Sequence, residues 1–105
     1  MENMKASLDD LSESVLDWAD ERGLLDEKNA PRQMLKVMEE VGELAGAIAK
    51  KNDDELVDAI GDSLVTIIIL AAQVGLSAQE CLGVAYDEIS GRKGETVDGV
   101  FIKDE

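Results

Sequence analysis

The stretch ELVDAIGDSLVTIIILAAQV, residues 55–74, decides the fold. Its second half is apolar on nearly every side, and the β-branched residues within 65–70 are also compatible with a strand. A continuous helical register from Leu56 through Val74, and the absence of turn residues in the apolar run, favour a helix instead. We therefore predict a helix over about residues 54–74 that is the central and most buried element of the chain.

Start and stop signals predict three more helices around this one. Ser7 is placed to cap the first, Pro31 suits the first turn of the second, and Ser77 opens a capping box for the last. The four predicted helices span residues 8–22, 31–51, 54–74 and 78–90. Their short connections indicate an all-α, four-helix bundle-like protomer that forms one domain over residues 1–105.

The C-terminal sequence RKGETVDGVFIKDE, residues 92–105, shows no sustained period. We interpret residues 91–105 as a tail that docks on a partner subunit through Val100, Phe101 and Ile102. A small chain buries only a modest core by itself, and its most apolar helix needs cover. We therefore expect a homodimer or a homotetramer.

Composition excludes several classes of function. The 24 acidic residues outnumber the 10 basic ones, for a formal net charge of -14, so attraction to nucleic acid or to an anionic membrane is not expected. The chain has no histidine and one cysteine, which rules out a Cys/His zinc site, a Ser-His-Asp triad and an intramolecular disulfide. We interpret the single cysteine, Cys81, as a core thiol because its neighbours are apolar.

The first residues, MENMKASLDD, lack the basic and apolar regions of a secretion signal. The longest near-continuous apolar run, residues 64–74, is shorter than the roughly 20 residues that span a bilayer. These two features lead us to expect a cytoplasmic protein.

Three carboxylates crowd one helical strip in VMEEVGELAG, residues 37–46. Glu39, Glu40 and Glu43 are three and four residues apart and therefore share a surface. An acidic face of this kind is often only solvated, and Lys36 is well placed to pair with Glu39 or Glu40. The spacing by itself leaves that interpretation open.

Two further acids lie on the next predicted helix, where Asp58 and Asp62 are spaced i, i+4. Asp62 has isoleucines on both sides, and a buried, unpaired carboxylate is unfavourable by several kcal/mol. A divalent cation would remove both this cost and the repulsion among the glutamates on the antiparallel neighbouring helix. Because only carboxylates are available, the ion would be Mg²⁺ or Mn²⁺.

A family resemblance covers more than half of the chain. The sequences KVMEEVGELAGAI, ELVDAIGDSLVTIIILAAQVGL and AYDEISGRKG resemble the MazG-like members of the all-α nucleoside triphosphate pyrophosphohydrolases. The hallmark of that family is Glu-Glu-x-x-Glu on one helix and Glu-x-x-Asp on the next. The first motif is intact, and the Asp of the second falls on Asp62. The Glu of the second falls on Ala59, and Asp58 on the same face is the candidate replacement.

The resemblance implies Mg²⁺-dependent hydrolysis of nucleoside or deoxynucleoside triphosphates to the monophosphate and pyrophosphate, in nucleotide-pool cleaning or regulation. It also implies roles for individual residues. The predicted metal ligands are Glu40, Glu43, Asp62 and Asp58. The predicted catalytic residues are Glu39, to orient or deprotonate the attacking water, and Lys36, to hold phosphate oxygens.

The predicted substrate-binding residues are Arg92, Lys93, Asp87 and Trp18. Arg92 and Lys93 match a basic pair that is common in this family after the last helix, whereas Asp87 stands where many relatives have Asn. Trp18 is the best candidate to stack on a base, although its place on an apolar face also suits a core residue. Two alternatives remain: a noncatalytic acidic module that binds a basic protein, and a slow family member weakened by Ala59.

Overall fold

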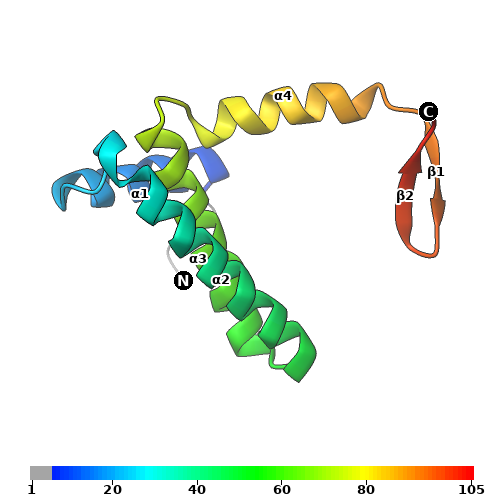
Figure 1. Ribbon diagram of the computed structural model, residues 1–105, viewed down its shortest axis with the longest axis horizontal. Coiled ribbons are helices and arrows are strands. Elements are labelled where there is room, and N and C mark those ends of the chain that lie inside the picture. Colours follow the sequence, from blue (N-terminus) through cyan, green and yellow to red (C-terminus); the bar gives the residue numbers. More distant parts are fainter. Residues whose placement is uncertain (1–5) are drawn as a thin grey trace.

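A computed structural model describes residues 6–105, which form four α-helices, one short 3-10 turn and a β-hairpin (Figure 1). The elements are α1 (Leu8–Glu21), η2 (Glu27–Asn29), α2 (Ala30–Lys50), α3 (Asp53–Gln73), α4 (Ala78–Ser90), β1 (Gly94–Val97) and β2 (Val100–Lys103). The predicted all-α class is confirmed, and the small hairpin is the addition to it.

Local hydrogen bonds explain where the helices begin. The Ser7 hydroxyl accepts from the Asp10 amide at 3.0 Å, and the Ser77 hydroxyl accepts from the Glu80 amide at 3.1 Å. The Asn52 side chain does the same for α3, accepting from the backbone amide of Glu55 at 3.1 Å. Each cap satisfies an amide that has no partner inside its own helix.

The α2–α3 pair is the most extensive contact in the fold (Figure 1). The buried residues of α3 are mostly small or polar, and only one of them is a large hydrophobe: Ala59, Ser63, Thr66, Ile69 and Gln73. The side chain of Gln33 donates to the Thr66 carbonyl at 3.0 Å and fixes the register of the pair. Small side chains let the two helix backbones approach closely.

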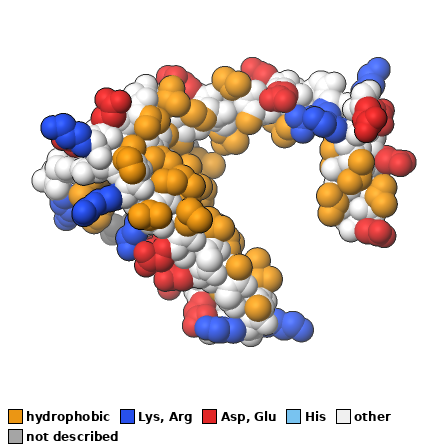
Figure 2. Space-filling model, viewed as in Figure 1, with side chains coloured by type: hydrophobic (Ala, Val, Ile, Leu, Met, Phe, Trp, Pro, Cys, Tyr) orange, Lys and Arg blue, Asp and Glu red, His pale blue; other side chains and the backbone are white. Residues whose placement is uncertain are grey.

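Helix α3 is the central and most buried of the four helices, as predicted: it has five buried residues, against two each in α1 and α2 and none in α4. Several of its large side chains are nevertheless exposed in the single chain. One edge of the α2–α3 pair, which we call the apolar face, carries large hydrophobic side chains that are 43% to 72% exposed. They are Met34, Met38, Val41 and Ile48 of α2 and Val57, Ile60, Leu64 and Ile67 of α3. Figure 2 shows hydrophobic side chains along the edge that looks toward the hairpin, and acidic ones on the opposite edge.

Helix α4 turns away from the other helices, at 101° to α3 (Figure 1). All residues from Cys81 to Ser90 are exposed, so the prediction of Cys81 as a core thiol is wrong. No single helix within residues 6–105 is long and apolar enough to cross a membrane. Helices α3 and α4 reach the length and apolar composition of a membrane span only when they are taken together across their bend.

The C-terminal segment forms an antiparallel hairpin and not the irregular tail that we predicted. Glu95 pairs with Ile102 and Val97 with Val100, on either side of a two-residue turn. Asp98 and Gly99 in that turn have φ of 50° and 79°, as a type I′ turn requires. The missed signal is the Asp-Gly pair itself, which lies between two short runs of β-forming residues.

Candidate metal and phosphate site

Carboxylates from α2 and α3 line the edge opposite the apolar face. We call this edge the acidic face; its residues are Glu39, Glu40, Glu43, Asp58 and Asp62. A hollow of about 440 Å³ opens along it, lined by Glu43, Gly46, Lys50, Glu55, Asp58, Ala59 and Asp62. The antiparallel pairing of α2 and α3 brings Glu43 of one helix to the same hollow as both aspartates of the other.

Glu40 lies deepest among these acids. It is half-buried, and its Oε2 atom is buried with no hydrogen-bond partner. Burial raises the pKa of Glu40, and the negative charges of Glu43 and Asp62 raise it further, against a smaller lowering by Lys36. A buried acceptor that lacks a donor and lies close to two other carboxylates is unfavourable unless a cation joins it.

Carboxylate oxygens are the ligands that a hard divalent cation prefers; Glu43 and Asp62 lie near enough to Glu40 to act on its charge, and Asp58 lines the adjoining hollow. In their present rotamers, no three Asp, Glu or Cys side chains within residues 6–105 are grouped closely enough to hold an ion. Glu43 and Asp62 are exposed, so a change of rotamer that turns them toward Glu40 meets little steric resistance.

The expectation that Asp62 is buried is wrong. Its side chain is exposed, because Asp62 lies on the edge of α3 between the α2 contact and solvent. Burial is found instead at Glu40, one helix away. The unfavourable buried carboxylate that suggests a cation is therefore Glu40 and not Asp62.

Lys36 and Glu39 lie together at the rim of the acidic face. Lys36 Nζ is 3.6 Å from Glu39 Oε2, and both side chains are more than half exposed. An exposed pair of this kind contributes at most about 1 kcal/mol to stability. Lys36 and Glu39 thus remain open to solvent beside the innermost carboxylate.

Glu55 and Lys50 belong to the same hollow and were missed. Lys50 Nζ is 3.9 Å from Glu55 Oε2, which closes one end of the hollow. A sequence signal for Glu55 was present: residues 55–58 form a Glu-x-x-Asp motif, one helical turn before the motif that we aligned on Asp62. Ala59, where the aligned Glu is absent, is buried between α2 and α3.

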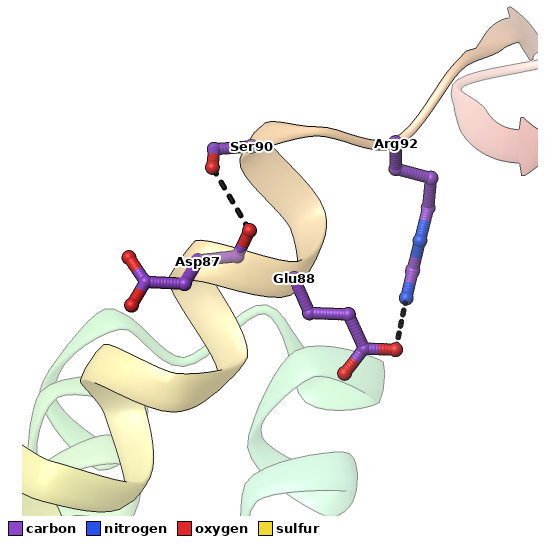
Figure 3. Close-up of polar contacts among 4 residues, drawn as sticks. All are labelled: Asp87, Glu88, Ser90 and Arg92. Atoms are coloured by element: carbon purple, nitrogen blue, oxygen red, sulfur yellow. Dashed lines mark hydrogen bonds and ion pairs between the residues drawn. The ribbon is translucent and has the colours of Figure 1, made fainter.

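The predicted substrate-binding residues lie elsewhere. Arg92 follows the far end of α4, away from the α2–α3 pair, and its Nη2 atom is 3.0 Å from Glu88 Oε1 (Figure 3). The Asp87 carbonyl accepts from the Ser90 hydroxyl at 3.1 Å, and the Asp87 carboxylate points away from Glu88 (Figure 3). Lys93 is exposed between α4 and β1.

Trp18 is 48% exposed and lines an apolar groove of about 580 Å³ between α1 and α3. The Arg22 guanidinium lies 4.3 Å from its ring centroid. Within one chain, therefore, the structure gathers the carboxylates and Lys36, but it does not bring Arg92, Asp87 or Trp18 to them.

Comparison with known proteins identifies this acidic helix pair. Residues 29–95 match the model of the MazG nucleotide pyrophosphohydrolase domain. The chain belongs to the MazG family. The matched region runs from η2 into β1 and contains every predicted site residue except Trp18.

A protein of Haemophilus phage HP1, described as an uncharacterized 18.2 kDa protein of the rep-hol intergenic region, is similar to this MazG-family chain. The two are 40% identical over 68 residues, which cover 65% of this chain and 42% of the phage protein. The chain thus spans less than half the length of that relative. No solved structure matches this MazG-family chain.

Proposed function

We propose that this MazG-family chain hydrolyses nucleoside or deoxynucleoside triphosphates to the monophosphate and pyrophosphate, in nucleotide-pool cleaning or regulation. One observation carries the proposal: the buried, unpartnered Oε2 of Glu40 lies beside two other carboxylates, within the family's Glu-Glu-x-x-Glu motif. The net charge of -14 repels a polyphosphate, so bound cations at these carboxylates would favour its binding.

Glu40, Glu43 and Asp62 would hold Mg²⁺, or Mn²⁺ in its place, with Asp58 and Glu55 available in the adjoining hollow. A bound ion of this kind neutralises phosphate oxygens and lowers the pKa of a water ligand. Glu39 orients the attacking water from the rim, and its partner Lys36 is exposed and able to contact a phosphate oxygen.

A second candidate is a noncatalytic module whose acidic face binds a basic protein. The net charge of -14 favours it, because such a charge steers cationic partners. The two functions differ at Glu40, since a protein contact surface has no use for a buried acceptor without a donor. A slow family member, weakened by Ala59, differs from the leading proposal only in rate.

The test uses the full chain with a panel of ribo- and deoxyribonucleoside triphosphates, in Mg²⁺ or in chelator, and measures pyrophosphate and phosphate release separately. We expect pyrophosphate only in Mg²⁺ and a loss of roughly a hundredfold or more in Glu40→Gln. Glu13→Gln, at an exposed position of α1, is the matched control and keeps full activity. Release of phosphate alone, or no turnover together with no change in melting temperature on adding Mg²⁺, contradicts the proposal.

A further inference from the structure

A second polar hollow, which we call the amide pocket, lies between the start of α2, the end of α3 and the loop after α1. Its volume is about 340 Å³, within the usual range for small-molecule sites. Two cations and three amides are among the residues that line it: Leu24, Asn29, Arg32, Gln33, Lys36 and Gln73. The hollow on the acidic face, by contrast, is lined mainly by carboxylates. The two hollows therefore suit different parts of a ligand.

Gln73, the last residue of α3, is the buried polar group of the amide pocket. It is only 4% exposed, and its Nε2 atom donates to the Leu24 carbonyl at 2.8 Å, which fixes the orientation of the amide. Its Oε1 atom is buried and has no hydrogen-bond partner among residues 6–105. A buried acceptor in this state is unfavourable unless a donor reaches it. The pocket therefore calls for a ligand that carries a hydrogen-bond donor.

The other polar side chains of the amide pocket differ in what they still offer. The Gln33 amide is already used, because its Nε2 atom donates to the Thr66 carbonyl at 3.0 Å. Lys36 pairs with Glu39 at 3.6 Å. Arg32 is exposed at the pocket and offers several N–H donors to an acceptor on a ligand. A matching ligand therefore has a donor for Gln73 and an acceptor for Arg32.

The amide pocket and the acidic face lie along one strip of α2. Gln33, Lys36 and Glu40 are separated by steps of three and four residues, so they share one side of the helix. Lys36 belongs to both regions, because it lines the pocket and pairs with Glu39 at the rim of the acidic face. Gln33 and Glu40 are about 10 Å apart along the helix axis. A nucleotide with its phosphates at the acidic face can therefore place its base in the pocket.

We propose that the amide pocket binds the base of the substrate, and that Gln73 selects bases with an N–H beside a carbonyl group. This inference rests on the proposed function. The N–H donates to Gln73 Oε1, and the neighbouring carbonyl accepts from Arg32. Guanine, hypoxanthine, uracil and thymine have this edge. Adenine and cytosine instead present a bare ring nitrogen to the Gln73 oxygen and an amino group to Arg32, so both contacts are lost.

The first test compares kcat/KM, in Mg²⁺, for pairs of substrates that differ only at this edge. Deoxyinosine and deoxyadenosine triphosphate form one pair, and deoxyuridine and deoxycytidine triphosphate form the other, so base size is constant within each pair. We expect the keto base of each pair to be preferred roughly a hundredfold. Gln73→Met keeps the length of the side chain without its acceptor, and should reduce this preference about tenfold.

The matched control is Gln33→Met. It removes a hydrogen bond of the same kind, to the Thr66 carbonyl, and leaves the Oε1 atom of Gln73 in place. A merely structural role of Gln73 would change rate and stability in both variants alike, whereas the preference within each pair should change only in Gln73→Met. Equal kcat/KM within both pairs for the wild type, or an unchanged preference in Gln73→Met, overturns the proposal.

A second test needs no hydrolysis, so it separates failure of the base pocket from failure of the proposed function. Inosine and adenosine, which carry no phosphate, are titrated in chelator into the isotope-labelled full chain, and NMR follows the side-chain amide of Gln73. We expect inosine to shift this resonance and to bind about tenfold more tightly than adenosine. Such binding in a chain that hydrolyses no nucleotide supports the pocket and contradicts the proposed function alone. A Gln73 amide that inosine does not shift overturns the base pocket, whether or not the chain is active.

Discussion

The acidic face and the apolar face are two edges of one helix pair, and on both edges the residues are spaced three or four apart along each helix. On the acidic face, the unfavourable feature is electrostatic: Glu40 has a buried oxygen without a donor, next to Glu43 and Asp62. On the apolar face, it is hydration, because large side chains of α2 and α3 are left 43% to 72% exposed. A bound cation would relieve the first, and burial against another protein surface would relieve the second.

The comparison teaches that a single chain leaves an unfavourable feature on each of its two faces. Among the described residues, no large side chain is fully buried. The buried residues are few and mostly small or polar, and they lie on α1, α2 and α3. The two faces can therefore be tested separately, since a substitution on one edge should leave the structure of the other edge largely unchanged.

The largest effect is expected from a charge on the apolar face. Ile60 is 46% exposed in one chain, so Ile60→Asp is compatible with the protomer fold but buries an unpaired carboxylate in a dimer. We expect the dimer to dissociate, with a loss of several kcal/mol in its free energy of unfolding. Light scattering and chemical denaturation measure both quantities.

The matched control for this change is Leu35→Asp, which places the same charge at a position that is 66% exposed and outside the apolar face. The control should keep the wild-type mass. Dimers of normal stability in Ile60→Asp would show that this edge faces solvent in the assembled protein.

A smaller effect is expected in the C-terminal hairpin, at Gly94, the first residue of β1. A Cβ atom at this position would collide with the carbonyl oxygen of Ile102 on the opposite strand and with the Phe101 ring. Gly94→Ala should therefore open the base of the hairpin and weaken dimerisation by about 1–3 kcal/mol. The comparison is Gly91→Ala, where nothing lies within 4 Å of the added atom. Equal dissociation constants for the two variants would contradict a supporting role for the hairpin.

The smallest effect on stability is expected on the acidic face, from the ionisation of Glu40. Its pKa in the folded chain is raised above the usual 4.5, first by burial and then by Glu43 and Asp62, so the folded state holds the proton more tightly than the unfolded state. The stability that this proton contributes is complete below pH 4.5 and is lost as pH rises through the raised pKa.

We therefore expect the melting temperature in chelator to fall with rising pH over that window, and Glu40→Gln to abolish this part of the fall. At pH 7, Mg²⁺ should raise the melting temperature of the wild type but not of Glu40→Gln. Identical pH profiles of the melting temperature for the two proteins would show that the ionisation of Glu40 does not affect stability.

Much of the fold was accessible from the sequence because it depends on near neighbours. Ser7, Asn52 and Ser77 cap the helices that follow them through hydrogen bonds to the third residue along the chain. The hairpin depends on equally near neighbours, but a search for a sustained period in residues 92–105 does not detect a two-residue turn such as Asp98-Gly99.

The candidate site was only partly accessible in this way. The sequence placed Glu40, Glu43 and Asp62 on facing helices, and the structure brings their charges together. It did not indicate which of them is buried, because burial depends on the rotation of α2 against α3. That rotation is set by small residues such as Ala59 and Ser63 at the contact, which carry no functional signal of their own.

The sequence by itself determined the helix boundaries, the order of the acidic motifs and the two-sided character of α2 and α3, since spacing along one helix fixes which side chains share a face. Only the tertiary structure decided that Asp62 and Cys81 are exposed, that Glu40 is the buried acid, and that α4 carries the hairpin away from the chain. Those features depend on contacts between segments far apart in the sequence, and on surface that a single chain leaves open.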